Sequence, residues 1–319
     1  MERQGDQAVV ATKSRDLPYL KMGSSTLKAE LDDGGDFYAE KAKNELRETP
    51  EVVEQALKDF KAMLKDEPGL HIADDDEFCW KFLRPCKWYP KNAFEMMKRF
   101  YKFKLNNPRY YLNLLPSNEK KVLSSDIVIP LPNRTANGCR LLLVNCGKAW
   151  NPKVISTDEI FRSVILSLEA AIAEPRTQIA GIHVILNMTG LTLTHVTHIT
   201  PSFAASVTDW IQRCLPCRLK GIHIVNQPFI FNMIYQIFKP FLLEKTRKRL
   251  HFHGTNRESL LSFVDENVLP VEFGGKYEMP RESIGQGIYD YFCWFEKDFE
   301  GNPLPFTYRL LFDIPIGRK

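Results

Sequence analysis

The sequence contains no apolar run of about 18 residues, the length that a helix needs to span a bilayer. Its first twenty residues include Asp6, Arg15 and Asp16 and lack a continuous apolar core, so we expect neither a signal peptide nor a membrane anchor. The seven cysteines follow no regular framework, which is typical of reduced thiols. Together these absences predict a cytosolic protein.

Signatures of catalysis are missing as well. No glycine-rich phosphate loop follows an apolar strand, and neither a nucleophile elbow nor a paired-carboxylate motif is present. The histidine pairs His195 with His198 and His251 with His253 have no Cys or carboxylate cluster at zinc spacing beside them. We therefore expect no enzyme, no cofactor and no metal.

The overall charge is mild. A formal net charge of +4 with a sequence pI near 8.5 argues against nucleic acid as the main partner, and any anion binding should be local. At 319 residues and 44% hydrophobic content, the chain can bury a substantial core in two domains.

The first 48 residues are polar and show little periodicity, which predicts a flexible arm. Helical spacing begins at Glu51, continues between Asp75 and Leu83, and resumes after Pro90. These stretches predict a small, all-helical domain over residues 49–112.

Strand and helix patterns then alternate. We expect strands at 140–144, 182–186, 221–225 and near 250–253, with helices at 157–173 and 201–214. This order predicts an α/β domain over residues 113–280, with a mostly parallel sheet flanked by helices. The tail, residues 281–319, is rich in aromatic residues and should pack on the body, because so many exposed rings would favour aggregation.

Residues 221–254 are the most informative segment. An apolar strand is followed by Pro228, which suits the first position of a helix. The helix expected after it is apolar on both sides and too short to span a bilayer. Two interpretations stay open: a helix buried in the core, or one whose outer side touches lipid.

Cations gather on either side of this helix. Lys245 and Arg249 are four residues apart and share a face if helical, while Arg218 and Lys220 point the same way if extended. Each cation alone could simply be a solvated surface charge. Four that converge could bind a polyphosphate headgroup.

Five sequence blocks in order carry a family resemblance: KFLR from Lys81 ahead of Trp88 and Tyr89, GIHVILNMTGL from Gly181, GIHIVNQP from Gly221, KPFLLEKTRKRLHFHG from Lys239, and LPVEFGG from Leu269. Over residues 50–280 the chain resembles the CRAL-TRIO (Sec14-like) family, in the branch of tocopherol transfer protein, retinaldehyde-binding protein and the clavesins. The resemblance implies a helical N-terminal domain and a sheet that forms the floor of a lipid cavity beneath a mobile gate helix.

The resemblance also implies site residues. The gate would span residues 229 to about 243 and include Phe229, Ile230, Met233, Ile234 and Ile237. Its cavity would be lined by apolar residues of two helices and two strands, with one face of the second helix at helical spacing: Phe161, Ile165, Leu168, Ile182, Leu186, Phe203, Val207, Trp210, Ile211, Leu215 and Ile222. A phosphoinositide would be held by Arg218, Lys220, Lys245 and Arg249, with Arg84 as a fifth cation.

The function implied is that of a monomeric cytosolic carrier. It would enclose one hydrophobic molecule of the tocopherol, retinoid or carotenoid class and transfer it to endosomal or plasma membranes that contain phosphatidylinositol bisphosphate. The alternative is a phosphoinositide-binding trafficking adaptor that moves no cargo.

Overall fold

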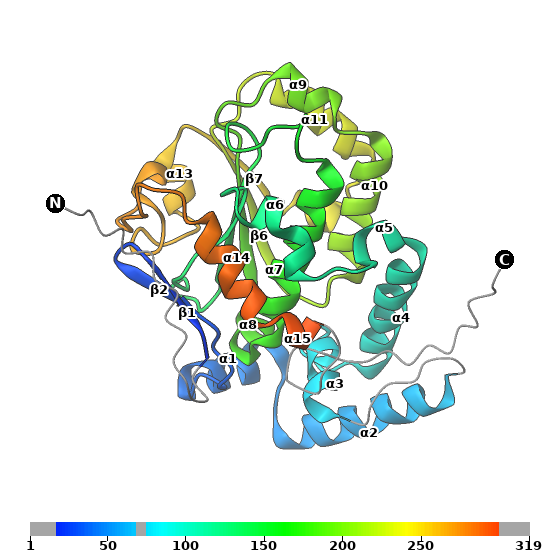
Figure 1. The fold of residues 1–319 in the computed structure, drawn as a ribbon. Coiled ribbons are helices and arrows are strands. Elements are labelled where there is room, and N and C mark those ends of the chain that lie inside the picture. The colour runs from blue at the N-terminus through cyan, green and yellow to red at the C-terminus, as the bar shows by residue number, and fades with distance from the viewer. Residues whose placement is uncertain (1–16, 68–74, 300–319) are drawn as a thin grey trace.

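A five-stranded sheet forms the centre of the molecule (Figure 1). The computed structural model describes residues 17–67 and 75–299. The strand order is β3-β4-β5-β6-β7, and only the β3–β4 pair is antiparallel. The strands are β3 (Val128–Pro130), β4 (Arg140–Asn145), β5 (Ile182–Asn187), β6 (Leu219–Val225) and β7 (Leu250–Gly254). The prediction of a mostly parallel α/β fold is confirmed.

Both faces of this sheet are covered. Because side chains alternate along a strand, Leu142 and Val144 join one hydrophobic cluster and Leu141 and Leu143 join another. The front face, with Leu142 and Val144, carries α7 (Thr157–Ala173), α10 (Pro201–Asp209) and α11 (Phe231–Phe238). The back face carries α13 (Arg257–Leu261), α14 (Gly285–Trp294) and the hairpin of β1 (Tyr19–Met22) and β2 (Ser25–Lys28).

The N-terminal helices pack as a separate cluster at the lower end of the sheet (Figure 1). They are α1 (Asp36–Leu46), α2 (Pro50–Asp66), α3 (Asp76–Leu83) and α4 (Pro90–Asn106). Thr49 caps α2 and Asp75 caps α3, each accepting a hydrogen bond from a first-turn N–H. The three helices expected from the spacing are thus present, and Phe60, Phe82 and Met97 form the middle of their shared core.

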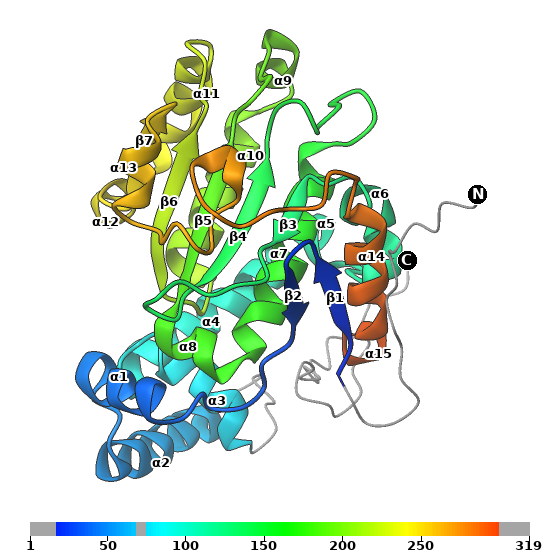
Figure 2. The same cartoon turned by 90° about the vertical axis from the view of Figure 1, so that its left-hand side faces the viewer.

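The prediction of a flexible arm over residues 1–48 is wrong for its described part, residues 17–48. Met22 in the hairpin and Leu46 in α1 are fully buried. Figure 2 shows the hairpin beside α14. Short strands with only a few apolar residues give almost no periodic signal, so this packing was hidden in the sequence. Residues 1–16 lie outside the described part.

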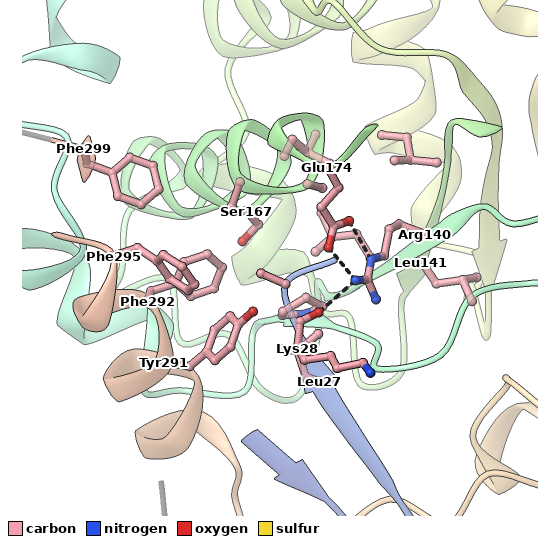
Figure 3. Close-up of a pocket in the computed structure, with 17 residues that line it drawn as sticks. Leu27, Lys28, Arg140, Leu141, Ser167, Glu174, Tyr291, Phe292, Phe295 and Phe299 are labelled. Atoms are coloured by element: carbon pink, nitrogen blue, oxygen red, sulfur yellow. Dashed lines mark hydrogen bonds and ion pairs between the residues drawn. The ribbon is translucent and has the colours of Figure 1, made fainter. Parts of the chain in front are cut away.

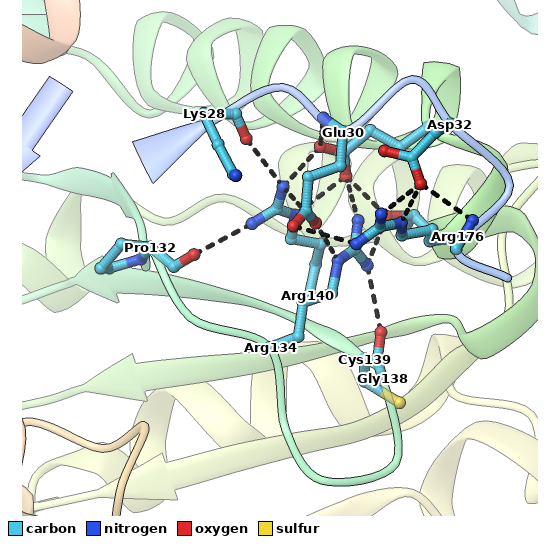
Figure 4. A network of polar contacts seen from close by, with 12 residues as sticks. Lys28, Glu30, Asp32, Pro132, Arg134, Gly138, Cys139, Arg140 and Arg176 are labelled. Carbon is cyan, nitrogen blue, oxygen red and sulfur yellow. Dashed lines mark hydrogen bonds and ion pairs between the residues drawn. The ribbon is translucent and has the colours of Figure 1, made fainter. Parts of the chain in front are cut away.

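An ion-pair network fixes the segment between the hairpin and α1 (Figure 4). The backbone N–H of Glu30 donates to Glu174 at 3.0 Å, and the Glu30 carboxylate pairs with Arg134, Arg140 and Arg176. Arg140 in turn donates to Glu174 at 2.5 Å. Buried charges persist only when they are paired and hydrogen-bonded, so each member of this network depends on the others.

The remaining short elements connect these layers. They are α5 (Pro108–Tyr111), η1 (Pro116–Glu119), α6 (Lys120–Leu123), α8 (Pro175–Ala180), α9 (Leu193–Thr197), η2 (Trp210–Cys214), η3 (Lys239–Phe241), α12 (Glu244–Arg247), η4 (Val271–Phe273) and α15 (Glu296–Phe299). The helix expected at 201–214 is α10 continued by a single π-helical turn, η2. In the described part of the tail, Ile288, Tyr291 and Phe292 are buried against the body.

Candidate functional site

A cavity of about 250 Å³ lies between the front face of the sheet and the helices α7, α10 and α11. We call it the main cavity. Its wall is built almost entirely of apolar side chains, and two of its few polar members are hydrogen-bonded to the backbone. The Thr208 hydroxyl donates to the Ala204 carbonyl at 2.7 Å, and the Gln212 amide bonds the backbone of Phe241 and Leu243. A roomy cavity with so apolar a wall favours an apolar guest.

Strand and helix periodicity decide which side chains point into the main cavity. Val184 and Leu186 alternate along β5, as Ile222 and Ile224 do along β6, so all four face the main cavity. On α7 the spacing of Phe161, Val164 and Leu168 places them on one helical face.

Nine of the eleven expected lining residues do line the main cavity: Phe161, Leu168, Ile182, Leu186, Phe203, Val207, Ile211, Leu215 and Ile222. Ile165 and Trp210 do not. Both are fully buried in the surrounding core, and the Trp210 indole N–H donates to the Tyr111 hydroxyl at 2.7 Å, which turns its ring away from the space. Trp210 therefore supports the wall from behind, with its ring edge-on to Phe161.

Sequence reasoning missed other parts of the wall. Val184 lies between the expected Ile182 and Leu186, and Ile224 follows Ile222 by two residues, so strand alternation could have found both. Val144 lies on β4, from which no lining residue was expected. Trp150, Leu191 and Ile199 lie in connections or short turns, where no periodicity marks the buried side. Their role follows only from the fold.

The apolar helix α11 forms the outer wall of the main cavity. The Phe231 N–H donates to the Pro228 carbonyl at 2.9 Å, so Pro228 belongs to a turn and the helix starts at Phe231. Of the five expected gate residues only Ile234 lines the main cavity; the other contacts of this segment come from Phe231, Tyr235, Phe238 and Leu242. Phe229 is 90% exposed and Met233 51% exposed, while Ile230 and Ile237 are half-buried outside the lining.

The sequence left open which face of this helix points inward, and the reason is physical. When both sides of a helix are apolar, periodicity alone cannot decide which side meets the sheet. The phase is set by the connection from β6, where Asn226 adopts a left-handed conformation with φ 55°. Arg257 on α13 donates to the Asn226 side chain at 2.8 Å and holds that turn in place.

Three of the five expected cations gather on one surface. Arg218 and Lys220 both contact the carboxylate of Glu45 on α1, at 2.6 Å and 3.2 Å. Burial alone would raise the pKa of Glu45, but hydrogen bonds from Lys41, Arg218 and Lys220 lower it to about 2. Arg249 is half-buried, and its pKa is lowered first by burial and then by the nearby charge of Arg218.

The other two cations differ from expectation. Lys245 is exposed on α12, which ends at Arg247, so Lys245 and Arg249 do not share a helix. Neither has an ion-pair partner within residues 17–67 and 75–299. Arg84 is 5% exposed and is held by Glu48 at 2.8 Å and by Gln178 at 2.9 Å. It is therefore a structural arginine and no longer a candidate for headgroup binding.

The back face of the sheet carries a chain of imidazoles. His183 Nδ1 lies 2.9 Å from His223 Nε2, His223 Nδ1 lies 3.0 Å from His253 Nε2, and His253 Nδ1 lies 2.8 Å from the Ser259 hydroxyl. Gly221 leaves space for this contact, since a Cβ there would lie 2.6 Å from His223 Nε2. Among the described residues, no group of three or more His, Cys, Asp or Glu side chains is arranged to hold a metal ion.

In the part of the chain that the structure describes, no helix combines the length and the hydropathy needed to cross a bilayer.

Known proteins match this architecture. Residues 124–275 match the model of the CRAL/TRIO domain. Alpha-tocopherol transfer protein-like of Mus musculus is 36% identical over 74% of this chain and 68% of its own length. Clavesin-1 of Rattus norvegicus is 32% identical over 74% of this chain and 67% of its own length.

A solved structure was also found, the crystal structure of Sfh5, with a TM-score of 0.42 and 13% identity; it covers 81% of this chain and 98% of its own. Every residue that lines the main cavity lies within residues 124–275, the range of the family match. The chain belongs to the CRAL/TRIO family, a family of lipid-binding proteins and not of enzymes.

Proposed function

We propose that this protein is a carrier that encloses one hydrophobic molecule of the tocopherol, retinoid or carotenoid class and delivers it to membranes that contain phosphoinositides. The observation that supports this most directly is the main cavity, an apolar space of about 250 Å³ closed on its outer side by a single short helix, α11. Burial of about 400 Å² of ligand surface contributes on the order of 10 kcal/mol before the costs of ordering, which gives tight but reversible binding.

Release would depend on α11. Its inner residues Phe231, Ile234 and Phe238 face the cavity, and opening in water would expose them. Phe229 and Met233 are already exposed on the outer side, beside Phe241 and Leu243. At a membrane this side can enter the headgroup region, where lipid chains replace the protein surface that α11 leaves on opening. The membrane therefore favours the open state by differential binding.

Headgroup recognition would lie on the cationic surface of Arg218, Lys220 and Arg249, with exposed Lys245 nearby. Several cations in one place can pair with the phosphates of phosphatidylinositol bisphosphate, and arginine can do so with two parallel hydrogen bonds. The Glu45 carboxylate pairs with two of these cations, Arg218 and Lys220, in the closed protein. An incoming headgroup would have to displace this carboxylate.

The first experiment identifies the cargo. The full chain is purified from eukaryotic cells, and the lipids that come with it are extracted and analysed by mass spectrometry. A stoichiometric isoprenoid or retinoid supports the carrier. An empty or phospholipid-filled cavity contradicts it and favours a phosphoinositide-binding adaptor that moves no cargo.

The second experiment tests delivery. Lys245→Glu combined with Arg249→Glu should abolish binding to vesicles that contain phosphatidylinositol bisphosphate while ligand loading is kept. Lys21→Glu with Lys153→Glu is the matched control, because it reverses two exposed lysines outside this surface. Unchanged vesicle binding by the first pair at physiological salt would show that the cationic surface is not the headgroup site.

A further inference from the structure

A second, smaller cavity lies behind α7, where the C-terminal helices pack on the body (Figure 3). We call it the rear chamber. Its volume is about 60 Å³, and its wall combines the second half of α7, the starts of β4 and β5, strand β2 and four aromatic residues of α14 and α15: Tyr291, Phe292, Phe295 and Phe299. These two helices lie outside residues 124–275, the range that matches the family model.

The rear chamber and the main cavity share a wall. Leu168 of α7 and Ile182 of β5 line both spaces. Both side chains are almost fully buried, and at this place their aliphatic groups separate the two cavities. Leucine has several staggered rotamers, so a passage between the two spaces would require a change of rotamer at Leu168 and no rearrangement of the sheet.

The rear chamber also contains a hydroxyl without a hydrogen-bond partner among the described residues, on a side chain that is almost fully buried. Tyr291 is 6% exposed, and Figure 3 shows its hydroxyl pointing to the middle of the chamber. It makes no hydrogen bond to any other residue within 17–67 and 75–299. Burial, followed by the charge of Glu174, raises the pKa of Tyr291, so the hydroxyl keeps its proton and remains a donor.

Neighbouring polar groups do not satisfy Tyr291 because they satisfy one another. Glu174 accepts hydrogen bonds from Arg140, Arg134 and Thr177 and from the N–H of Glu30. The Ser167 hydroxyl donates to the Ser163 carbonyl at 2.9 Å. The Tyr291 hydroxyl is therefore a donor that faces the space of the rear chamber, where a ligand or an ordered water can accept from it.

We propose that the rear chamber receives one end of the hydrophobic cargo, and that this end carries a hydroxyl or carbonyl oxygen that accepts a hydrogen bond from Tyr291. This inference rests on the proposed carrier function and names a chemical property of its cargo. The apolar middle of the molecule occupies the main cavity and passes between Leu168 and Ile182. A space of about 60 Å³ accommodates a few heavy atoms, since about 10–15 Å³ measured in this way holds one water.

Two ligands that differ by one hydroxyl test this assignment: hexadecane, which has no hydrogen-bond acceptor, and 1-hexadecanol. Their affinities for the full chain are measured by displacement of a fluorescent fatty-acid analogue. We expect the wild-type protein to favour 1-hexadecanol over hexadecane about three- to tenfold more than Tyr291→Phe does, the range of one hydrogen bond to a buried neutral group. Tyr291→Phe should lose this preference and leave the affinity for hexadecane unchanged.

The control is Tyr289→Phe, which removes a hydroxyl from the same helix at a residue that lines neither space and should keep the preference. Ala170→Leu provides a second variant, because Ala170 lines only the rear chamber and a larger side chain would fill it. It should weaken binding of both hexadecane and 1-hexadecanol but not of a ligand short enough for the main cavity alone.

The inference is overturned if the ratio of the two affinities is the same in the wild-type protein and in Tyr291→Phe, as expected if a water satisfies Tyr291. This result leaves the carrier function intact as long as hydrophobic ligands bind. If neither ligand binds, and retinol and tocopherol fail as well, the carrier function itself is refuted together with this inference.

Discussion

Glu45→Gln should increase the affinity for phosphoinositides. The Glu45 carboxylate contacts Arg218 and Lys220, the two cations that the headgroup also needs, and its side chain is 33% exposed. Half-exposed pairs of this kind contribute about 0.2–1 kcal/mol each. Releasing both therefore removes about 0.4–2 kcal/mol of competition, which corresponds to a roughly 2- to 30-fold gain in headgroup affinity.

The assay is co-sedimentation with phosphatidylcholine vesicles that contain phosphatidylinositol bisphosphate, at physiological salt so that remote charges are screened. The control is Glu244→Gln, which makes the same charge change on α12, where Glu244 pairs only with exposed Lys248 at 2.8 Å. Vesicles with phosphatidylserine in place of the phosphoinositide measure general attraction to anionic lipid.

Two results would refute this reasoning. If Glu45→Gln binds no better than wild type, Arg218 and Lys220 do not take part in headgroup binding. If Glu45→Gln and Glu244→Gln gain equally, the gain reflects net charge and not a site that Glu45 occupies. Ligand loading should be the same in all three proteins, because Glu45 does not line the main cavity.

Three further outcomes follow from the same geometry. Phe229→Ser should slow transfer of a loaded ligand to vesicles while loading stays normal, because Phe229 is exposed and does not line the main cavity; equal transfer rates would remove the outer side of α11 from the mechanism. Burial lowers the pKa of His183 to about 4 and that of His223 to about 3, so both stay neutral in the folded protein. Below about pH 6.5 the unfolded chain takes up protons at these histidines that the folded chain does not, so the free energy of unfolding should fall by about 2 kcal/mol for each histidine at about pH 5. Urea unfolding at about pH 7.5 and at about pH 5 would measure this loss, and equal stabilities at the two pH values would contradict it. Arg84→Leu should lower the free energy of unfolding by about 3 kcal/mol, because it leaves a half-buried carboxylate unpaired, yet leave vesicle binding intact; a variant that folds normally but loses vesicle binding would restore Arg84 to the headgroup site.

The main cavity could be predicted to a large extent from the sequence. Ile182, Leu186 and Ile222 lie on strands whose alternation has only two possible faces, and the family blocks indicate which face meets the ligand. The phase of α11 could not be predicted in this way. Both of its sides are apolar, so the choice between Met233 and Phe231 as the inner residue depended on the turn at Asn226.

For the cations, too, the sequence predicted one part of the site and left another part open. Their positions are visible in the sequence, but their partners are not. Arg84 and Glu48 are 36 residues apart, and Arg218 and Glu45 are 173 residues apart, so no local pattern reveals that the first arginine is buried and that the second is already paired. Ion pairs between distant segments are decided by how those segments pack.

The sequence by itself determined the α/β order, the family, the apolar character of the cavity wall and the gathering of cations near it, because these depend on local spacing and composition. Only the tertiary structure decided which face of α11 closes the main cavity, which of the five cations are already paired, and that the N-terminal hairpin and the C-terminal helices enclose the far side of α7 around Tyr291. These features arise where segments distant along the chain meet, and burial and pairing at such places depend on the whole fold.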